Sequence, residues 1–116
     1  MNIVESHEGT TSILALEGPL DTASAPSLSA RAFALCGEGA RTLLLDLAKV
    51  PHLTSAGFRS FIAIRRRAAE GSIDLVLCGP NEVVRELFEI SGMLGSFRIL
   101  PDRGAALAAI AGVKSA

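Results

Sequence analysis

The side chain best suited to chemistry is Ser55, in a short segment near the middle of the chain. It lies in the run Val50-Pro51-His52-Leu53-Thr54-Ser55-Ala56-Gly57, where an apolar stretch ends and a helical pattern begins. A serine at a helix start has an ordinary explanation, because its hydroxyl can cap an unpaired backbone N–H. Its neighbours Ala56 and Gly57 are small, however, and glycine in a helix costs stability relative to alanine. Small residues beside a hydroxyl suit the close approach of a second molecule.

Phosphorylation is the chemistry that this position favours. A helix N-terminus accommodates an anion, because its free N–H groups and partial positive charge point outward. A phosphate would add about −1.5 to −2 charges and three acceptor oxygens. If the same surface binds a partner, that charge must be desolvated or must meet like charge, and binding weakens. Ser55 is therefore a candidate switch, with helix capping as the alternative.

Direct catalysis has little support in the sequence. His52 precedes Ser55 by three residues, but no G-x-S-x-G elbow surrounds the serine, and His7 falls in a predicted edge strand. Asp46 lies near the end of a buried strand, as in a phospho-aspartate receiver, but the first strand lacks the paired carboxylates that would hold Mg²⁺. We expect Asp46 to bond a backbone N–H in the following loop, and we expect the protein not to be an enzyme.

The composition excludes several classes of function. The 116 residues carry a net charge of −1, which does not fit the strongly basic face of a nucleic-acid-binding protein. Arg65-Arg66-Arg67 is a basic run on a predicted helix, and it is either a solvated face or a surface that steers an acidic partner. Cys36 and Cys78 lack C-x-x-C spacing and a histidine cluster, so we expect buried thiols and no metal or cofactor.

The two ends of the chain indicate a cytoplasmic protein. Residues 2–8 are polar and acidic, unlike a signal peptide. The longest apolar stretch, residues 105–113, is about half of the roughly 20 residues that span a bilayer. We therefore expect reduced cysteines and no membrane insertion.

Turn residues divide the chain into elements that would position Ser55. Strands are predicted at 1–8, 12–17, 42–47, 73–78 and 97–100. A helix is predicted over residues 22–36, with Thr22 or Ser24 as its cap. A second helix is predicted over residues 55–69, with Phe58, Phe61, Ile62 and Ala69 near one face. Two more helices are predicted, one that begins after the cap Asn81 and one that begins after the cap Asp102.

The order β-β-α-β-α-β-α-β-α predicts an α/β fold in one domain over residues 1–116. We expect a single mixed, mostly parallel sheet of about five strands with about four helices. In such sheets the functional loops cluster beyond the carboxyl ends of the strands. Two loops have suitable chemistry, residues 18–22 and residues 50–57.

Four segments resemble the STAS domain family, which takes its name from sulphate transporters and anti-sigma factor antagonists. They are Gly18-Pro19-Leu20-Asp21, residues 43–61, Leu75-Val76-Leu77-Cys78-Gly79 and residues 84–93. The resemblance spans nearly the whole chain in the right order, and it implies the STAS fold.

The resemblance also implies a function. In stand-alone bacterial members, a partner anti-sigma factor that is also a serine kinase phosphorylates the serine aligned with Ser55. The unphosphorylated form binds this kinase and frees the sigma factor, and a phosphatase resets the switch. By resemblance, Ser55 is the acceptor, and the partner-binding surface consists of Asp21, Thr22, Thr54, Ser55, Ala56, Gly57 and Arg59. We expect a monomer or a weak dimer.

The segment around Ser55 departs from the family's usual motif at two positions. Better-known members have Asp-Ser-Ser-Gly where this chain has Thr54-Ser55-Ala56-Gly57, so the acidic residue is missing and we expect different contacts with the kinase. Ala56 removes a second acceptor and leaves Thr54 as the competing hydroxyl. The alternative function is a non-catalytic STAS subunit or scaffold of a membrane transport or stress-signalling complex.

Overall fold

Strands and helices alternate along the chain as the turn residues predict. The computed structural model describes residues 1–115, with side chains described through residue 112. The strands are β1 (Asn2–Glu8), β2 (Thr11–Glu17), β3 (Thr42–Lys49), β4 (Asp74–Cys78) and β5 (Arg98–Leu100); the helices are α1 (Ala25–Gly37), α2 (Ser55–Glu70), α3 (Glu82–Ile90) and α4 (Arg103–Ser115), with a 3₁₀ turn at Leu94–Ser96.

The five strands form one sheet in the order β1-β2-β3-β4-β5. β1 pairs with β2 in antiparallel fashion, and every later pair is parallel. The predicted α/β class, with a mixed sheet and four helices, is confirmed. Because β2, β3 and β4 run in the same direction, their carboxyl ends lie along one edge of the sheet, and the loops that follow them are neighbours.

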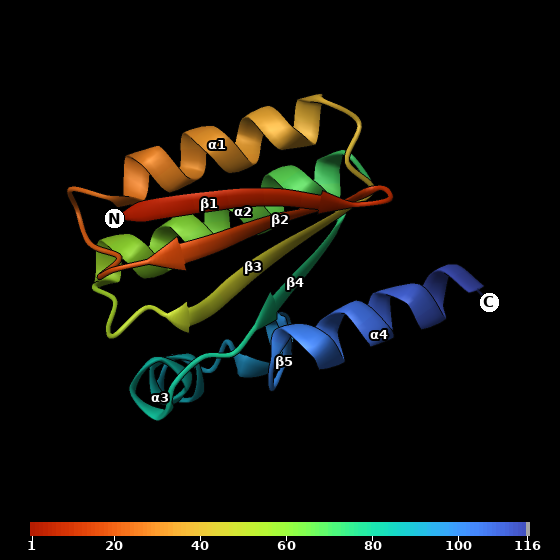
Figure 1. The fold of residues 1–116 in the computed structure, drawn as a ribbon. Coiled ribbons are helices and arrows are strands. Elements are labelled where there is room, and N and C mark those ends of the chain that lie inside the picture. The colour runs from red at the N-terminus through yellow and green to blue at the C-terminus, as the bar shows by residue number, and fades with distance from the viewer. Residues whose placement is uncertain (116) are drawn as a thin grey trace.

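Helices cover both faces of the sheet, which explains the continuous apolar runs of the inner strands. α1 and α2 lie on one face and α4 lies on the other (Figure 1). Leu43, Leu45 and Leu47 alternate toward the larger hydrophobic cluster, which includes residues of α1 and α2. Leu44 points the other way and packs in a cluster with Ile110 of α4.

Two helix assignments need correction. α1 begins at Ala25 rather than at residue 22, and neither Thr22 nor Ser24 caps it through its side chain. The carboxylate of Asp21 instead accepts hydrogen bonds from the backbone N–H groups just before the helix. In α2, Ala69 is exposed, and its neighbour Ala68 is buried. The predicted caps of α3 and α4 are confirmed, since Asn81 and Asp102 accept from the backbone N–H groups three residues on.

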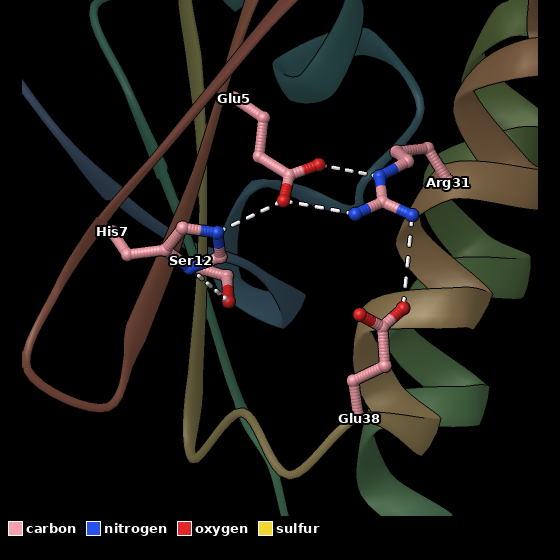
Figure 2. A network of polar contacts seen from close by, with 5 residues as sticks. All are labelled: Glu5, His7, Ser12, Arg31 and Glu38. Carbon is pink, nitrogen blue, oxygen red and sulfur yellow. Dashed lines mark hydrogen bonds and ion pairs between the residues drawn. The ribbon is translucent and has the colours of Figure 1, made fainter.

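A polar network ties the edge strand β1 to α1 (Figure 2). The guanidinium of Arg31 binds both carboxylate oxygens of Glu5, and this interaction holds the pKa of Glu5 below its ordinary value. His7 lies between Glu5, 2.9 Å from its Nε2, and the hydroxyl of Ser12, 3.2 Å from its Nδ1. Glu38 completes the group at 3.7 Å from Arg31. His7 thus has structural partners on β1 and β2.

Two of the three side chains in the basic run of α2 lie over aromatic rings, although Arg67 remains exposed. Arg65 lies over the ring of Phe97 and donates to the carbonyl of Ser96 at 3.0 Å. Arg67 lies over the ring of Phe33 at 5.7 Å. Arg66 is exposed. Cation–π contacts of this kind hold a charged side chain against an aromatic ring. The basic run is therefore only partly a solvated face, which was one of the two interpretations of the sequence.

Candidate functional site

The two loops singled out in the sequence lie against each other at the carboxyl ends of β2 and β3. A parallel bridge pairs Leu20 with Leu53. The N–H of Leu20 donates to the carbonyl of His52 at 3.2 Å, and the N–H of Thr54 donates to the carbonyl of Leu20 at 3.0 Å. These bonds continue the β2–β3 pairing beyond the strands. The predicted adjacency of the loops carrying Asp21 and Ser55 is confirmed.

Helix α2 begins at Ser55, but Thr54 caps it. The backbone of Thr54 is extended, and its Oγ1 accepts a hydrogen bond from the N–H of Gly57 at 3.3 Å. Ser55 is exposed, and its hydroxyl makes no hydrogen bond to any residue between 1 and 112. The capping explanation for Ser55 is therefore wrong. Thr54 is the residue that caps α2, and threonine and aspartate are both good caps.

Gly57 is small because of a contact inside the protein, and the prediction that it admits a second molecule is wrong. The residue is buried, and a Cβ built on it would lie 2.5 Å from the carbonyl oxygen of Leu20 and 2.9 Å from its Cγ. Glycine is thus required because the loop after β2 crosses directly over the first turn of α2. Ala56 is half-buried, so the open surround of Ser55 does not come from these two residues.

Asp21 acts as a structural carboxylate in the loop after β2. Its Oδ1 accepts hydrogen bonds at 3.0 Å from the N–H groups of Ala23 and Ser24, and at 3.1 Å from the hydroxyl of Ser24. The bonds from Ser24 hold the pKa of Asp21 below its ordinary value. Thr22 is exposed at the tip of this loop. Asp21 therefore shapes the edge of the site.

An apolar groove of about 620 Å³ opens beside Ser55, between α2 and α3. Its lining combines apolar with polar side chains: Leu53, Phe58, Leu87 and Ile90 with Thr54, Ser55, Arg59 and Ser91. Ile90 leaves 74% of its surface exposed. The groove thus brings exposed apolar surface next to polar side chains at the start of α2.

Sequence reasoning did not identify the α3 side of this groove. Val84, Leu87 and Phe88 form an apolar stripe at helical spacing on α3, in which Val84 and Phe88 are buried, but Leu87 is only half-buried and also lines the groove. Ile90 lies outside that stripe at the end of the helix. A large apolar residue away from the core face of a helix is the signal by which the sequence could have indicated this part of the groove.

Asn81 anchors the loop that leads to Ser55. Its side-chain amide donates to the carbonyls of Val50, at 3.4 Å, and of Pro51, at 3.1 Å, while its oxygen caps α3 through the N–H of Val84. One side chain thus links the start of α3 to the segment before α2. This link joins the two groove walls together with the packing of Phe58 against Phe88, whose ring centroids lie 5.0 Å apart.

The surroundings of Ser55 do not resemble those of a catalytic nucleophile. Within residues 1–112, no hydrogen bond or ion pair involves the exposed side chain of His52, so it does not hydrogen-bond the Ser55 hydroxyl. Asp46 accepts from the N–H of Ala48 at 3.0 Å, as expected, and also from Arg103 at 3.0 Å. In the described part of the chain, no group of three or more His, Cys, Asp or Glu residues could hold a metal ion.

Cys78 is completely buried, and burial raises the pKa of its thiol to about 12. Cys36 is half-buried, and burial raises its pKa as well. Both cysteines are free thiols. None of the helices in the described chain has both the length and the hydrophobicity needed to cross a bilayer.

Comparison with known proteins identifies the family. The family model described as the STAS domain matches residues 2–106. A protein of Bordetella bronchiseptica named "Putative anti-sigma factor antagonist BtrV" is 37% identical over 97 residues, which cover 84% of each chain. Both matches rest on sequence, and the family model extends across both loops of the site.

Solved structures show the same fold. SpoIIAA, named an anti-sigma factor antagonist, matches in its unphosphorylated form with a TM-score of 0.82 and 20% identity, covering 96% of this chain and 97% of SpoIIAA. An anti-sigma factor antagonist from Mycobacterium paratuberculosis matches with a TM-score of 0.84 and 20% identity, covering 93% and 92%. The match to the family model, the similarity to the relative and the shared fold lead to one conclusion: this chain belongs to the STAS domain family.

Proposed function

We propose that this protein is an anti-sigma factor antagonist that acts by partner switching, with Ser55 as its phosphorylation site. The observation that carries the proposal is the placement of the Ser55 hydroxyl, which is exposed and without a hydrogen-bond partner in the described chain, at the edge of the apolar groove. The neighbouring hydroxyl of Thr54 is engaged as a helix cap. Of the two candidate acceptors, only Ser55 is available without loss of the helix start.

The partner is an anti-sigma factor that is also a serine kinase. The unphosphorylated protein binds this kinase, phosphorylated Ser55 releases it, and a phosphatase resets the switch. The name of the Bordetella relative supports the antagonist role, and the solved forms of SpoIIAA, unphosphorylated and phosphorylated, support a switch by phosphorylation. In this proposal the chain is a single cytoplasmic STAS domain and a substrate of an enzyme rather than an enzyme itself.

The groove explains how one phosphate could change binding. Phe58, Leu87 and Ile90 offer apolar surface that a partner would bury, and Ser55 lies at the border of that surface. A phosphate of about −1.5 to −2 charges there would have to lose its water when the partner docks. Burying an uncompensated charge costs far more than the apolar contacts contribute. Release of the partner follows.

Phosphorylation by the partner kinase tests the assignment. The protein is incubated with the purified kinase and ATP, and its intact mass is followed together with that of Ser55→Ala. Ser27→Ala is the matched control, because Ser27 is also an exposed serine near the start of a helix. We expect one added phosphate in the wild type and in Ser27→Ala, and none in Ser55→Ala. Normal phosphorylation of Ser55→Ala would overturn the site.

Binding of the same kinase tests the switch. Ser55→Ala keeps the groove uncharged and should bind like the wild type, whereas Ser55→Asp brings a charge to its edge and should bind at least tenfold more weakly, a change of about 1.4 kcal/mol. Calorimetry without ATP measures both affinities. Equal affinities would show that charge at residue 55 does not control the complex.

A further inference from the structure

Arg59 lies one helical turn after Ser55 on the same side of α2. Both residues are exposed, and both line the groove between α2 and α3. Residues four apart on a helix have Cβ atoms about 5–6 Å apart. This spacing places the guanidinium of Arg59 within reach of any group attached to the Ser55 hydroxyl.

Arg59 has no internal partner, in contrast to most of the arginines. Within residues 1–112 it forms no ion pair, hydrogen bond or ring contact. Five other arginines are engaged with carboxylates, a carbonyl or aromatic rings: Arg31, Arg65, Arg67, Arg85 and Arg103. Arg59 is thus an uncompensated cation beside the candidate phosphoserine.

We propose that Arg59 binds the phosphate of phosphorylated Ser55 within the same chain, and that this pairing withdraws its positive charge from the partner-binding surface. The inference rests on the proposed function, because it assumes that Ser55 carries the phosphate. An acidic group placed four residues before a basic one is the favourable orientation on a helix. The planar guanidinium matches phosphate oxygens with two parallel hydrogen bonds.

The pairing gives phosphorylation two effects at one edge of the groove. Before modification, Arg59 is an exposed cation that can attract an acidic group on a partner. After modification, the same guanidinium is engaged by the phosphate, and the edge carries net negative charge. A partner that relied on Arg59 loses that attraction and meets a repulsive charge instead. Specificity changes of this kind use a repulsive element together with the loss of an attractive one.

The experiment measures the second ionisation of the phosphate directly. Phosphoserine is installed at residue 55 by genetic-code expansion, and its pKa is followed by ³¹P NMR over a pH titration of the intact protein. A cation beside the phosphate favours the dianion and lowers this pKa. Arg59→Gln should raise the pKa by about 0.2–0.4 pH units, the shift that an exposed i,i+4 pair supports. Arg59→Lys keeps the charge and should recover part of the lowering.

Arg66→Gln is the matched control. Arg66 is exposed on the same helix, eleven residues and therefore about 16 Å beyond Ser55 along the axis, where salt screens most of its effect. In Arg66→Gln the pKa of the phosphate should stay close to that of the unsubstituted phosphoprotein. An unchanged pKa in Arg59→Gln, or an equal shift in Arg66→Gln, would overturn the pairing. Because no kinase is used, such a failure is separate from a failure of Ser55 to be phosphorylated by its partner.

Discussion

Replacing Gly57 by alanine tests whether the two loops of the site are held together by a close backbone contact. The added Cβ would lie 2.5 Å from the carbonyl oxygen of Leu20 and 3.0 Å from its carbonyl carbon. A backbone atom cannot rotate away as a flexible side chain can, so the loop after β2 must move. Overpacking of this kind costs about 1–3 kcal/mol. The higher helix propensity of alanine offsets up to about 1 kcal/mol of that.

We therefore expect Gly57→Ala to lower the free energy of unfolding by roughly 1–2 kcal/mol, measured by urea unfolding with circular dichroism. The N–H of Thr54, which donates to the displaced carbonyl of Leu20, should exchange faster with solvent. Gly112→Ala is the control, because Gly112 lies in α4 with nothing within 4 Å of an added Cβ. That variant should be neutral or more stable. If Gly57→Ala proves as stable as Gly112→Ala, the close contact with Leu20 does not constrain the site.

Two further predictions concern the cap and the thiols. Thr54→Ala removes the side-chain bond to Gly57 and should lower the free energy of unfolding by about 1 kcal/mol. Thr54→Asp should keep most of the wild-type stability, because aspartate is also a good cap. If urea unfolding shows that Thr54→Asp is no more stable than Thr54→Ala, the capping role is contradicted. Cys78 is buried with a thiol pKa of about 12, so a thiol reagent at neutral pH should modify it only as the protein unfolds. The variant Cys36→Ser leaves Cys78 as the one thiol to label. Rapid labelling of this variant in its native state would refute the prediction that Cys78 is inaccessible.

The fold was predictable because its signals are local. Continuous apolar runs such as residues 42–47 indicate strands covered on both faces, and turn residues mark where they end. Helix starts were predictable where a residue caps its own helix, as Asn81 does for α3. The prediction failed for α1, because the carboxylate of Asp21 bonds the N–H groups before the helix and delays its start.

The site was predictable only in part, because its geometry depends on contacts between distant residues. The pattern around Ser55 indicated a helix start, but only the contact of Gly57 with Leu20 explains the glycine. The groove requires α3 to lie beside α2, so Ile90 could not be connected to Ser55 from spacing alone. Free and engaged arginines look alike in a sequence, and the structure distinguishes Arg59 from Arg65 and Arg67.

The order of the strands in the sheet is also the order in which the ribosome synthesises them. Each new strand of the growing chain can join the one made just before it, without waiting for a distant segment. The loop before Ser55, however, receives its anchor from Asn81 only after β4 has been synthesised. A nascent chain therefore displays the serine before the surface around it is complete. A partner that recognises the finished groove would ignore unfinished chains.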